Sequence, residues 1–181
     1  DSGKRPINYT LDAQVALIER FLDQLGISKM AIVGHGLGGA VSLRFASQHP
    51  EMIARLMTIG APLNGASINP RLHNDTISTL LEWLVSKGPD NDSITNETKK
   101  IDPSVIPMSI EDIANMDLTI GLGVVNAPTL LVHGEKDLAI APPADDWFNG
   151  GRTNLHRISF EGGNHFPMLD DPAKFNRLLA D

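Results

Sequence analysis

Two polar residues in this sequence have the types and positions that proton transfer requires. Asp137 lies four residues beyond the apolar run 128–133, and His165 follows the run 155–160 behind two adjacent glycines. A carboxylate that accepts a hydrogen bond from an imidazole fixes its tautomer and stabilises its protonated form. We therefore expect Asp137 to orient His165 as a general base, although each residue alone is also common in a turn or a loop.

A glycine-rich turn at 34–39, Gly-His-Gly-Leu-Gly-Gly, follows another apolar run. A strand, a sharp turn and a helix in this order form a nucleophile elbow, whose central residue has a strained backbone and carries the nucleophile. The centre here is Gly36, where a serine is expected, and Gly34 and Gly38 are the small residues that let the chain segments pass closely. The following helix would point its N-terminus at the site, so the Leu37 amide is a candidate oxyanion donor.

The same turn has a second interpretation. Residues 34, 36 and 39 are all glycine and match the G-x-G-x-x-G pattern of a dinucleotide-binding loop. Such a loop needs an acidic residue about 20 residues further on to bind a ribose hydroxyl. The next apolar strand ends at Ile59-Gly60 without one. The positions of Asp137 and His165 therefore favour acyl transfer over nucleotide binding.

Alternating strands and helices are predicted around these segments. Apolar residues at helical spacing occupy 11–25, with Thr10 as the N-cap and Gly26 as the stop. Asp170-Asp171 is a candidate N-cap for the last helix. Helices are also predicted at 37–48, 76–86, 109–115, 142–149 and 171–180, and strands at 29–34, 53–59, 128–133 and 155–160. The alternation is typical of an α/β fold with a mainly parallel sheet flanked by helices.

In its order of elbow, acid and base, the chain resembles the α/β-hydrolase superfamily, in the esterase, lipase and C–C hydrolase branch. The resemblance implies that Gly36 stands at the nucleophile position, with Asp137 as the acid and His165 as the base. It covers nearly everything outside residues 63–118, which are rich in Asn, Asp, Ser and Pro. We predict that this segment is a helical cap inserted into a core of residues 1–62 and 119–181.

The matching part corresponds to the C-terminal two-thirds of the family's fold, so the family's first strands have no counterpart in this sequence. Those strands would carry the second oxyanion amide. The strand at 29–34 would then present an exposed apolar edge, which isolated domains avoid. We therefore expect missing N-terminal strands of the same protein to complete the sheet.

The helical, moderately apolar cap predicts a small hydrophobic ester or acyl substrate, and no cofactor is expected. Candidates for the substrate pocket are His35, Trp83, Leu84 and Phe166. His35 fits a packing role behind the turn as well, and Trp83 could equally serve only to bury the cap helix. His133, inside a strand, is expected to be a buried histidine whose hydrogen bonds are satisfied.

Gly36 leaves three hypotheses open. A glycine cannot form an acyl-enzyme, and loss of the nucleophile costs a triad enzyme on the order of 10⁶ in turnover. The chain is a serine hydrolase disabled at Gly36, a pseudoenzyme that uses the pocket for binding or signalling, or an enzyme, such as a lyase, that needs only His165 and Asp137. We favour hydrolase ancestry with a disabled site.

Composition excludes several other classes. The 181 residues carry a formal net charge of −7 and include no cysteine. Nucleic acid is not an expected partner, because phosphate binding needs clustered Lys and Arg. Disulfides, thiolate catalysis and cysteine-based zinc sites are excluded, and no cluster suggests a metal. No run of about 20 apolar residues predicts a membrane span, and the lack of cysteine favours the cytoplasm.

Overall fold

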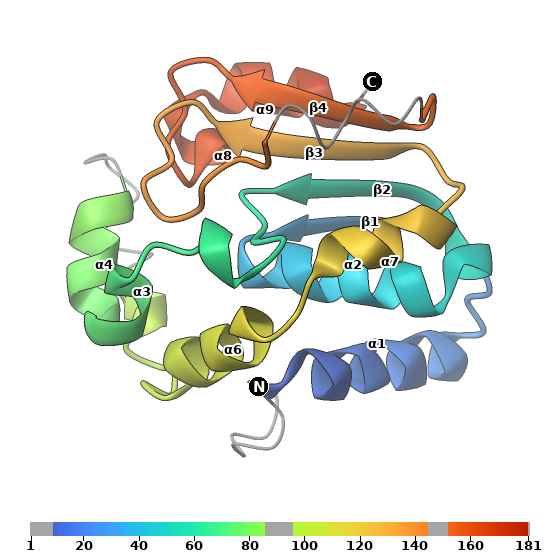
Figure 1. The fold of residues 1–181 in the computed structure, drawn as a ribbon, viewed down its shortest axis with the longest axis horizontal. Coiled ribbons are helices and arrows are strands. Elements are labelled where there is room, and N and C mark those ends of the chain that lie inside the picture. The colour runs from blue at the N-terminus through green and yellow to red at the C-terminus, as the bar shows by residue number, and fades with distance from the viewer. Residues whose placement is uncertain (1–8, 86–95, 145–151, 181) are drawn as a thin grey trace.

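The computed structural model describes residues 9–85, 96–144 and 152–180. A four-stranded sheet runs through its centre in the order β1-β2-β3-β4, with every neighbouring pair parallel (Figure 1). The strands are β1 (Met30–His35), β2 (Ile53–Ile59), β3 (Thr129–Gly134) and β4 (Leu155–Phe160). Because the strands are parallel, the segments that follow them all lie at one edge of the sheet. The predicted α/β class and its four strands are confirmed.

The first helix, α1 (Leu11–Leu25), begins and ends as its sequence predicts. The Thr10 hydroxyl accepts a hydrogen bond from the Ala13 amide at 3.2 Å. Gly26 ends the helix with a φ of 66°, a left-handed conformation that glycine adopts without cost. Leu11, Val15 and Leu22 form the buried stripe that packs into the main core.

The second helix, α2 (Leu37–Gln48), connects β1 to β2 and lies against both strands. Small residues allow its close approach to the sheet, since Ala40 and Ala46 are fully buried. Leu43 and Phe45 fill the space around them. The N-terminus of α2 is thereby fixed at the carboxyl end of β1.

Between β2 and β3 the chain forms helices α3 (Arg71–Asn74), α4 (Ile77–Leu84), α6 (Val105–Ala114) and α7 (Leu118–Gly121). Single 3-10 turns occur at Pro50–Met52, Gly65–Ser67 and Leu122–Val124. The helix expected at 109–115 begins four residues earlier, at Val105. Pro107 lies in its first turn, where a missing N–H breaks no intrahelical hydrogen bond. Helices α3 and α4 lie beyond the carboxyl ends of the strands (Figure 1).

Helix α9 (Pro172–Ala180) lies on the face of the sheet opposite α2 (Figure 1). It follows the single turn α8 (Pro167–Asp170). A second core cluster joins Phe175 to Met57, Val132 and Phe160. Asp171 caps α9, because its Oδ1 accepts from the Lys174 amide at 2.9 Å. Of the helix expected at 142–149, residues 142–144 are not helical and the rest lie outside the described residues.

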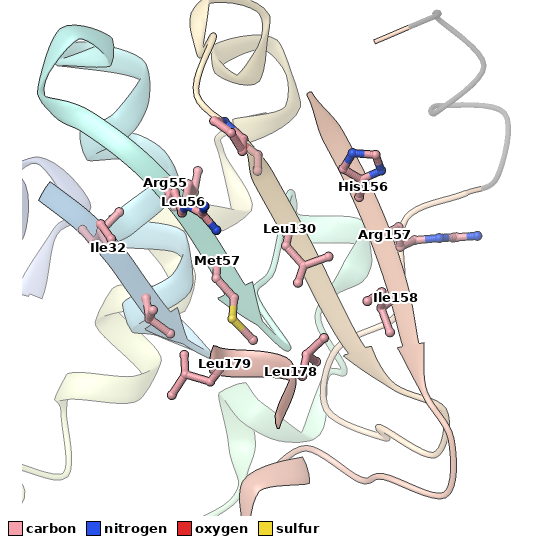
Figure 2. A pocket seen from close by; sticks show the side chains of 14 residues that line it. Ile32, Arg55, Leu56, Met57, Leu130, His156, Arg157, Ile158, Leu178 and Leu179 are labelled. Carbon is pink, nitrogen blue, oxygen red and sulfur yellow. The ribbon is translucent and has the colours of Figure 1, made fainter. Parts of the chain in front are cut away.

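Among the described residues, α9 covers this face of the sheet only in part. An apolar hollow of about 490 Å³ remains there, and we call it the open sheet face (Figure 2). It is lined among others by Val33, Met57, Leu130, Ile158 and Leu179. Val33 is 50% exposed. In the described part of the chain, no helix has the length and apolar character that a bilayer crossing requires.

Candidate functional site

The turn between β1 and α2 holds Gly36 in a conformation that other residues rarely adopt. Its φ is 53° and its ψ is −122°. The Gly36 amide donates to the Ile59 carbonyl at 2.8 Å, so the turn is tied to the end of β2. A positive φ at the centre of a strand–turn–helix segment is the strained backbone that an elbow requires.

Close packing in this turn depends on Gly34 and Gly39. A Cβ on Gly34 would collide with the Gly38 carbonyl oxygen, and one on Gly39 would lie 2.6 Å from the Ala61 Cβ. A Cβ on Gly38 would meet nothing within 4 Å. The expectation that Gly38 lets chain segments pass closely is therefore wrong, because a side chain at that position would point into open space.

Asp137 and His165 are brought together from the ends of β3 and β4. His165 Nδ1 lies 2.9 Å from Asp137 Oδ2. The other oxygen, Oδ1, accepts from the amides of Ala139 at 2.8 Å and Ile140 at 3.2 Å, which orients the carboxylate. A carboxylate can only accept here, so His165 carries its proton on Nδ1 when the ring is neutral. The Nε2 nitrogen then has a lone pair that can accept a proton, as a general base requires.

Gly60, the residue that follows β2, lies beside the pair formed by Asp137 and His165. Its φ is 55°. A Cβ there would lie 3.1 Å from both Asp137 Oδ2 and His165 Nδ1. A side chain there would press on both hydrogen-bonded atoms, and the positive φ also favours glycine at this position.

The loop that carries His165 is held by two residues to which the sequence assigned other roles. His35 Nε2 lies 2.8 Å from the His165 carbonyl oxygen, which can only accept, so His35 donates. Burial, with the nearby His165 ring, lowers the pKa of His35 to about 4, so its ring is neutral near neutral pH. Asp170, expected to cap α9, instead accepts from the Asn164 amide at 2.7 Å. Nothing in the sequence pattern distinguishes Asp170 from its capping neighbour Asp171.

The elbow and the base face each other. A Cβ built on Gly36 would lie 3.3 Å from His165 Nε2. The space at Gly36 is thus within hydrogen-bonding reach of the free nitrogen of the base. Ser42, the nearest hydroxyl along α2, instead donates to the Gly38 carbonyl at 2.8 Å.

An apolar cavity of about 320 Å³ opens on this pair, and we call it the His165 cavity. Its lining includes Leu37, Leu84 and Phe166, as well as Gly36 and His165. Aliphatic residues from α4 and α6 make up much of the rest, among them Leu80, Leu81, Ile106 and Ile110. The volume is at the lower end of the roughly 300–1,000 Å³ that small-molecule sites occupy.

Two candidates for this pocket do not line it. The Arg71 guanidinium lies over the Trp83 ring, 4.3 Å from the ring centroid. Trp83 is not on the cavity side of α4, which is formed by positions 80, 81 and 84. His35 packs against the rings of His165 and Phe166 in tilted contacts, with centroids 4.7 Å apart in each case. It therefore supports the pocket from behind.

His133 differs from its expectation in one respect. It is only 2% exposed, and burial lowers its pKa. In the part of the chain that the structure describes, neither ring nitrogen has a partner in hydrogen-bonding geometry, although the Ala61 backbone lies beside the ring. The predicted burial is confirmed, but the predicted hydrogen bonds are not made. Among the described residues no three His, Asp or Glu side chains are grouped as a metal site requires.

Comparison with known proteins establishes the family. The sequence profile described as the alpha/beta hydrolase fold matches residues 1–92 of the chain. The chain belongs to the α/β-hydrolase fold family. Curated relatives include the strigolactone esterase D14 of Arabidopsis thaliana, which is 24% identical, with 94% of this chain and 72% of that protein aligned. A putative carbamate hydrolase, RutD, of Pseudomonas savastanoi pv. phaseolicola is also 24% identical, over 97% of this chain and 76% of the relative.

Solved α/β-hydrolase structures share the fold. An esterase from Exiguobacterium antarcticum superposes with a TM-score of 0.80 at 19% identity, over 98% of this chain and 76% of that one. A mutant N-acyl homoserine lactonase in complex with N-hexanoyl homoserine gives 0.78 at 19% identity, over 98% and 71%. At these identities the likeness establishes the architecture. The relatives are hydrolases, which supports hydrolase ancestry for this chain.

Proposed function

We propose that this chain is a serine-hydrolase relative that binds a small hydrophobic ester or acyl compound and is disabled by Gly36 at the nucleophile position. The observation that carries the proposal is the 3.3 Å between the Gly36 Cβ position and His165 Nε2. A side chain at that point would present its hydroxyl to a base already oriented by Asp137. Glycine presents none, so no acyl-enzyme forms.

The His165 cavity supports the proposed substrate class. Its lining is mostly apolar, so a charge on the acyl chain would lose its hydration without compensation. The solved lactonase neighbour holds a hexanoyl compound. An acyl chain of similar length is compatible with the cavity volume here. We assign the cap role to residues 63–118, which contribute α4 and α6 to the lining.

The partner of the open sheet face is part of the same proposal. Its apolar strands and the exposed Val33 on the edge strand β1 support completion of the sheet by further strands of the same protein. The site and the open sheet face lie on different parts of the sheet, so ligand binding and coverage can be tested separately.

Reinstating a nucleophile tests the proposal. Gly36→Ser should increase hydrolysis of short nitrophenyl esters by at least about 10³-fold over the parent chain, because removing such a serine costs up to roughly 10⁶. Gly38→Ser is the matched control, since a side chain there meets nothing within 4 Å and gives His165 no hydroxyl. A folded Gly36→Ser protein no faster than Gly38→Ser would contradict the proposal.

A further inference from the structure

The loop that begins with Asp137 is attached to the beginning of the cap. We call residues 137–141 the acid loop. The cap segment 67–69 runs antiparallel to this loop, with Ile68 opposite Ile140. Two backbone hydrogen bonds, of 2.9 Å and 2.7 Å, join the two segments. The acid loop is therefore held by the cap as well as by the strand that precedes it.

The paired segments contact both the carboxylate and the His165 cavity. The amides of Ala139 and Ile140, which donate to Asp137 Oδ1, belong to the half of the acid loop that pairs with the cap. Ile68 and Ile140 are buried and line the His165 cavity. A displacement of this wall would therefore reach the carboxylate through the backbone of the acid loop.

Asn69 is the cap residue whose side chain reaches the acid loop. Its Nδ2 donates to the Leu138 carbonyl at 2.9 Å, across 69 positions of the chain. Its Oδ1 accepts from the Arg71 amide at 3.0 Å, at the start of α3. Leu138 directly follows Asp137, so the first of these bonds fixes the peptide next to the carboxylate. One side chain thus joins the first cap helix to the acid loop.

We propose that Asn69 is a positioning residue for the base, because it holds the acid loop where Asp137 selects the tautomer of His165. The inference rests on the proposed role of His165 as a general base. The carboxylate keeps the ring proton on Nδ1 only while Oδ2 stays within hydrogen-bonding distance, which is 2.9 Å here. A loosened loop lets the neutral ring move its proton to Nε2. The nitrogen that faces Gly36 then has no lone pair to accept a proton.

Two substitutions separate the bond to the acid loop from the support of α3. Asn69→Asp keeps an oxygen for the Arg71 amide but loses the donor, and it places a carboxylate against the Leu138 carbonyl. Asn69→Ala loses both bonds. Asn74→Ala is the matched control, because the Asn74 Nδ2 donates to the Pro70 carbonyl at 3.1 Å and this bond stays within the cap.

Nitrogen-15 NMR of the imidazole rings measures the tautomer of His165 in the unmodified chain and in each variant. The pH is set high enough for the ring to be neutral, and the spectrum of His165→Gln identifies the His165 signals. The parent should show one tautomer, with its proton on Nδ1. Asn69→Asp and Asn69→Ala should both add the signals of the tautomer with its proton on Nε2. Asn74→Ala should match the parent. A residue that only supports the cap would not change these signals.

Hydrogen exchange measures the acid loop itself. The amides of Ala139 and Ile140 should exchange about five-fold faster or more in both Asn69 variants, which is the effect of one lost hydrogen bond. The Gly60 amide donates to the Val132 carbonyl at 2.8 Å and reports on the sheet. It should keep its parent rate in every variant.

The proposal is wrong if Asn69→Asp keeps the single Nδ1–H tautomer and the parent exchange rates, because Asn69 then only supports α3. It is also wrong if Asn74→Ala has the same effect, since any weakening of the cap would then loosen the acid loop. Melting temperatures show whether the variants fold. If Asn69→Asp does not, Asn69→Ala compared with Asn74→Ala decides the question.

The Gly36→Ser assay keeps this inference distinguishable from the proposed function. If the Asn69 variants show the second tautomer but Gly36→Ser gives no esterase activity, the positioning role stands and the proposed hydrolase ancestry fails. If Gly36→Ser hydrolyses esters but the Asn69 variants keep the parent tautomer, the proposed function stands and the positioning role fails.

Discussion

The sheet carries two apolar hollows, and they differ in the polar groups that face them. The His165 cavity has a volume of about 320 Å³ and contains a buried imidazole and a helix N-terminus. The open sheet face is larger, about 490 Å³, but its polar residues, such as Arg55 and Arg157, come from the strands that it overlies (Figure 2). Apolar volume alone therefore does not define a site. A functional site also needs buried polar groups that face the volume.

The largest expected effect concerns the chemistry that only the His165 cavity provides. In the Gly36→Ser background, His165→Ala should reduce ester hydrolysis about 10⁴-fold, because the new hydroxyl loses its base. Met57→Ala, on the open sheet face, should change the rate by less than about three-fold. Initial rates with a nitrophenyl ester measure both. Equal losses for the two variants would remove the distinction between the hollows.

Two adjacent leucines of β3 test the same contrast in stability. Leu131 is fully buried in the main core, whereas Leu130 is only partly buried and lines the open sheet face. Leu131→Ala should lower the free energy of unfolding by about 3 kcal/mol and Leu130→Ala by about 1 kcal/mol, because only the first leaves a closed cavity. Urea titrations followed by circular dichroism measure both. If Leu130→Ala costs as much as Leu131→Ala, something covers the open sheet face in solution.

A pH effect should arise on the His165 side. Burial lowers the pKa of His35 to about 4 from its ordinary 6.5. The unfolded chain thus takes up a proton at a higher pH than the folded chain, and stability present above pH 6.5 is lost as the pH falls towards 4. Between pH 7 and pH 5 the loss should be about 2 kcal/mol.

His35→Gln is the control for this loss, since the glutamine amide can still donate to the His165 carbonyl but does not titrate. Urea unfolding at the two pH values should show a decrease for the parent that is larger by about 2 kcal/mol than for His35→Gln. Parallel decreases in the two proteins would show that another group is responsible.

The smallest effect is expected on the open sheet face itself. Val33 is half exposed, so Val33→Lys should change the free energy of unfolding by less than about 0.5 kcal/mol. It should nevertheless reduce binding of a hydrophobic dye, because it places a charge over the apolar strands. Ester hydrolysis in the Gly36→Ser background, measured in parallel, should stay unchanged. A large loss of stability would mean that Val33 is covered.

The fold was largely predictable because its elements follow local rules. Thr10 and Gly26 mark the ends of α1, and buried apolar runs mark the strands. The pairing of Asp137 with His165 also followed from their positions after neighbouring strands. Side-chain direction was not predictable to the same degree. Helical spacing does not say which face of a short helix meets a cavity, so the sequence left open whether Trp83 lines the pocket.

Residues that position other residues escaped the sequence analysis for a different reason. The tie between Asp170 and the Asn164 amide joins positions six apart through a turn whose shape the local pattern does not specify. The role of Gly60 depends on two side chains from the loops that follow β3 and β4. Both are properties of the assembled site and leave no periodic signal in the chain.

The tie between Asp170 and Asn164 makes the base loop a reporter of local opening. The Asn164 amide is held by α8, which packs with the C-terminal helix α9. Fraying of these helices would release this amide and loosen His165 while the sheet stays intact. Exchange of the Asn164 amide with deuterated solvent should therefore follow the opening of the C-terminal helices, not global unfolding. The time for which His165 stays correctly placed would then depend on how often helices α8 and α9 open.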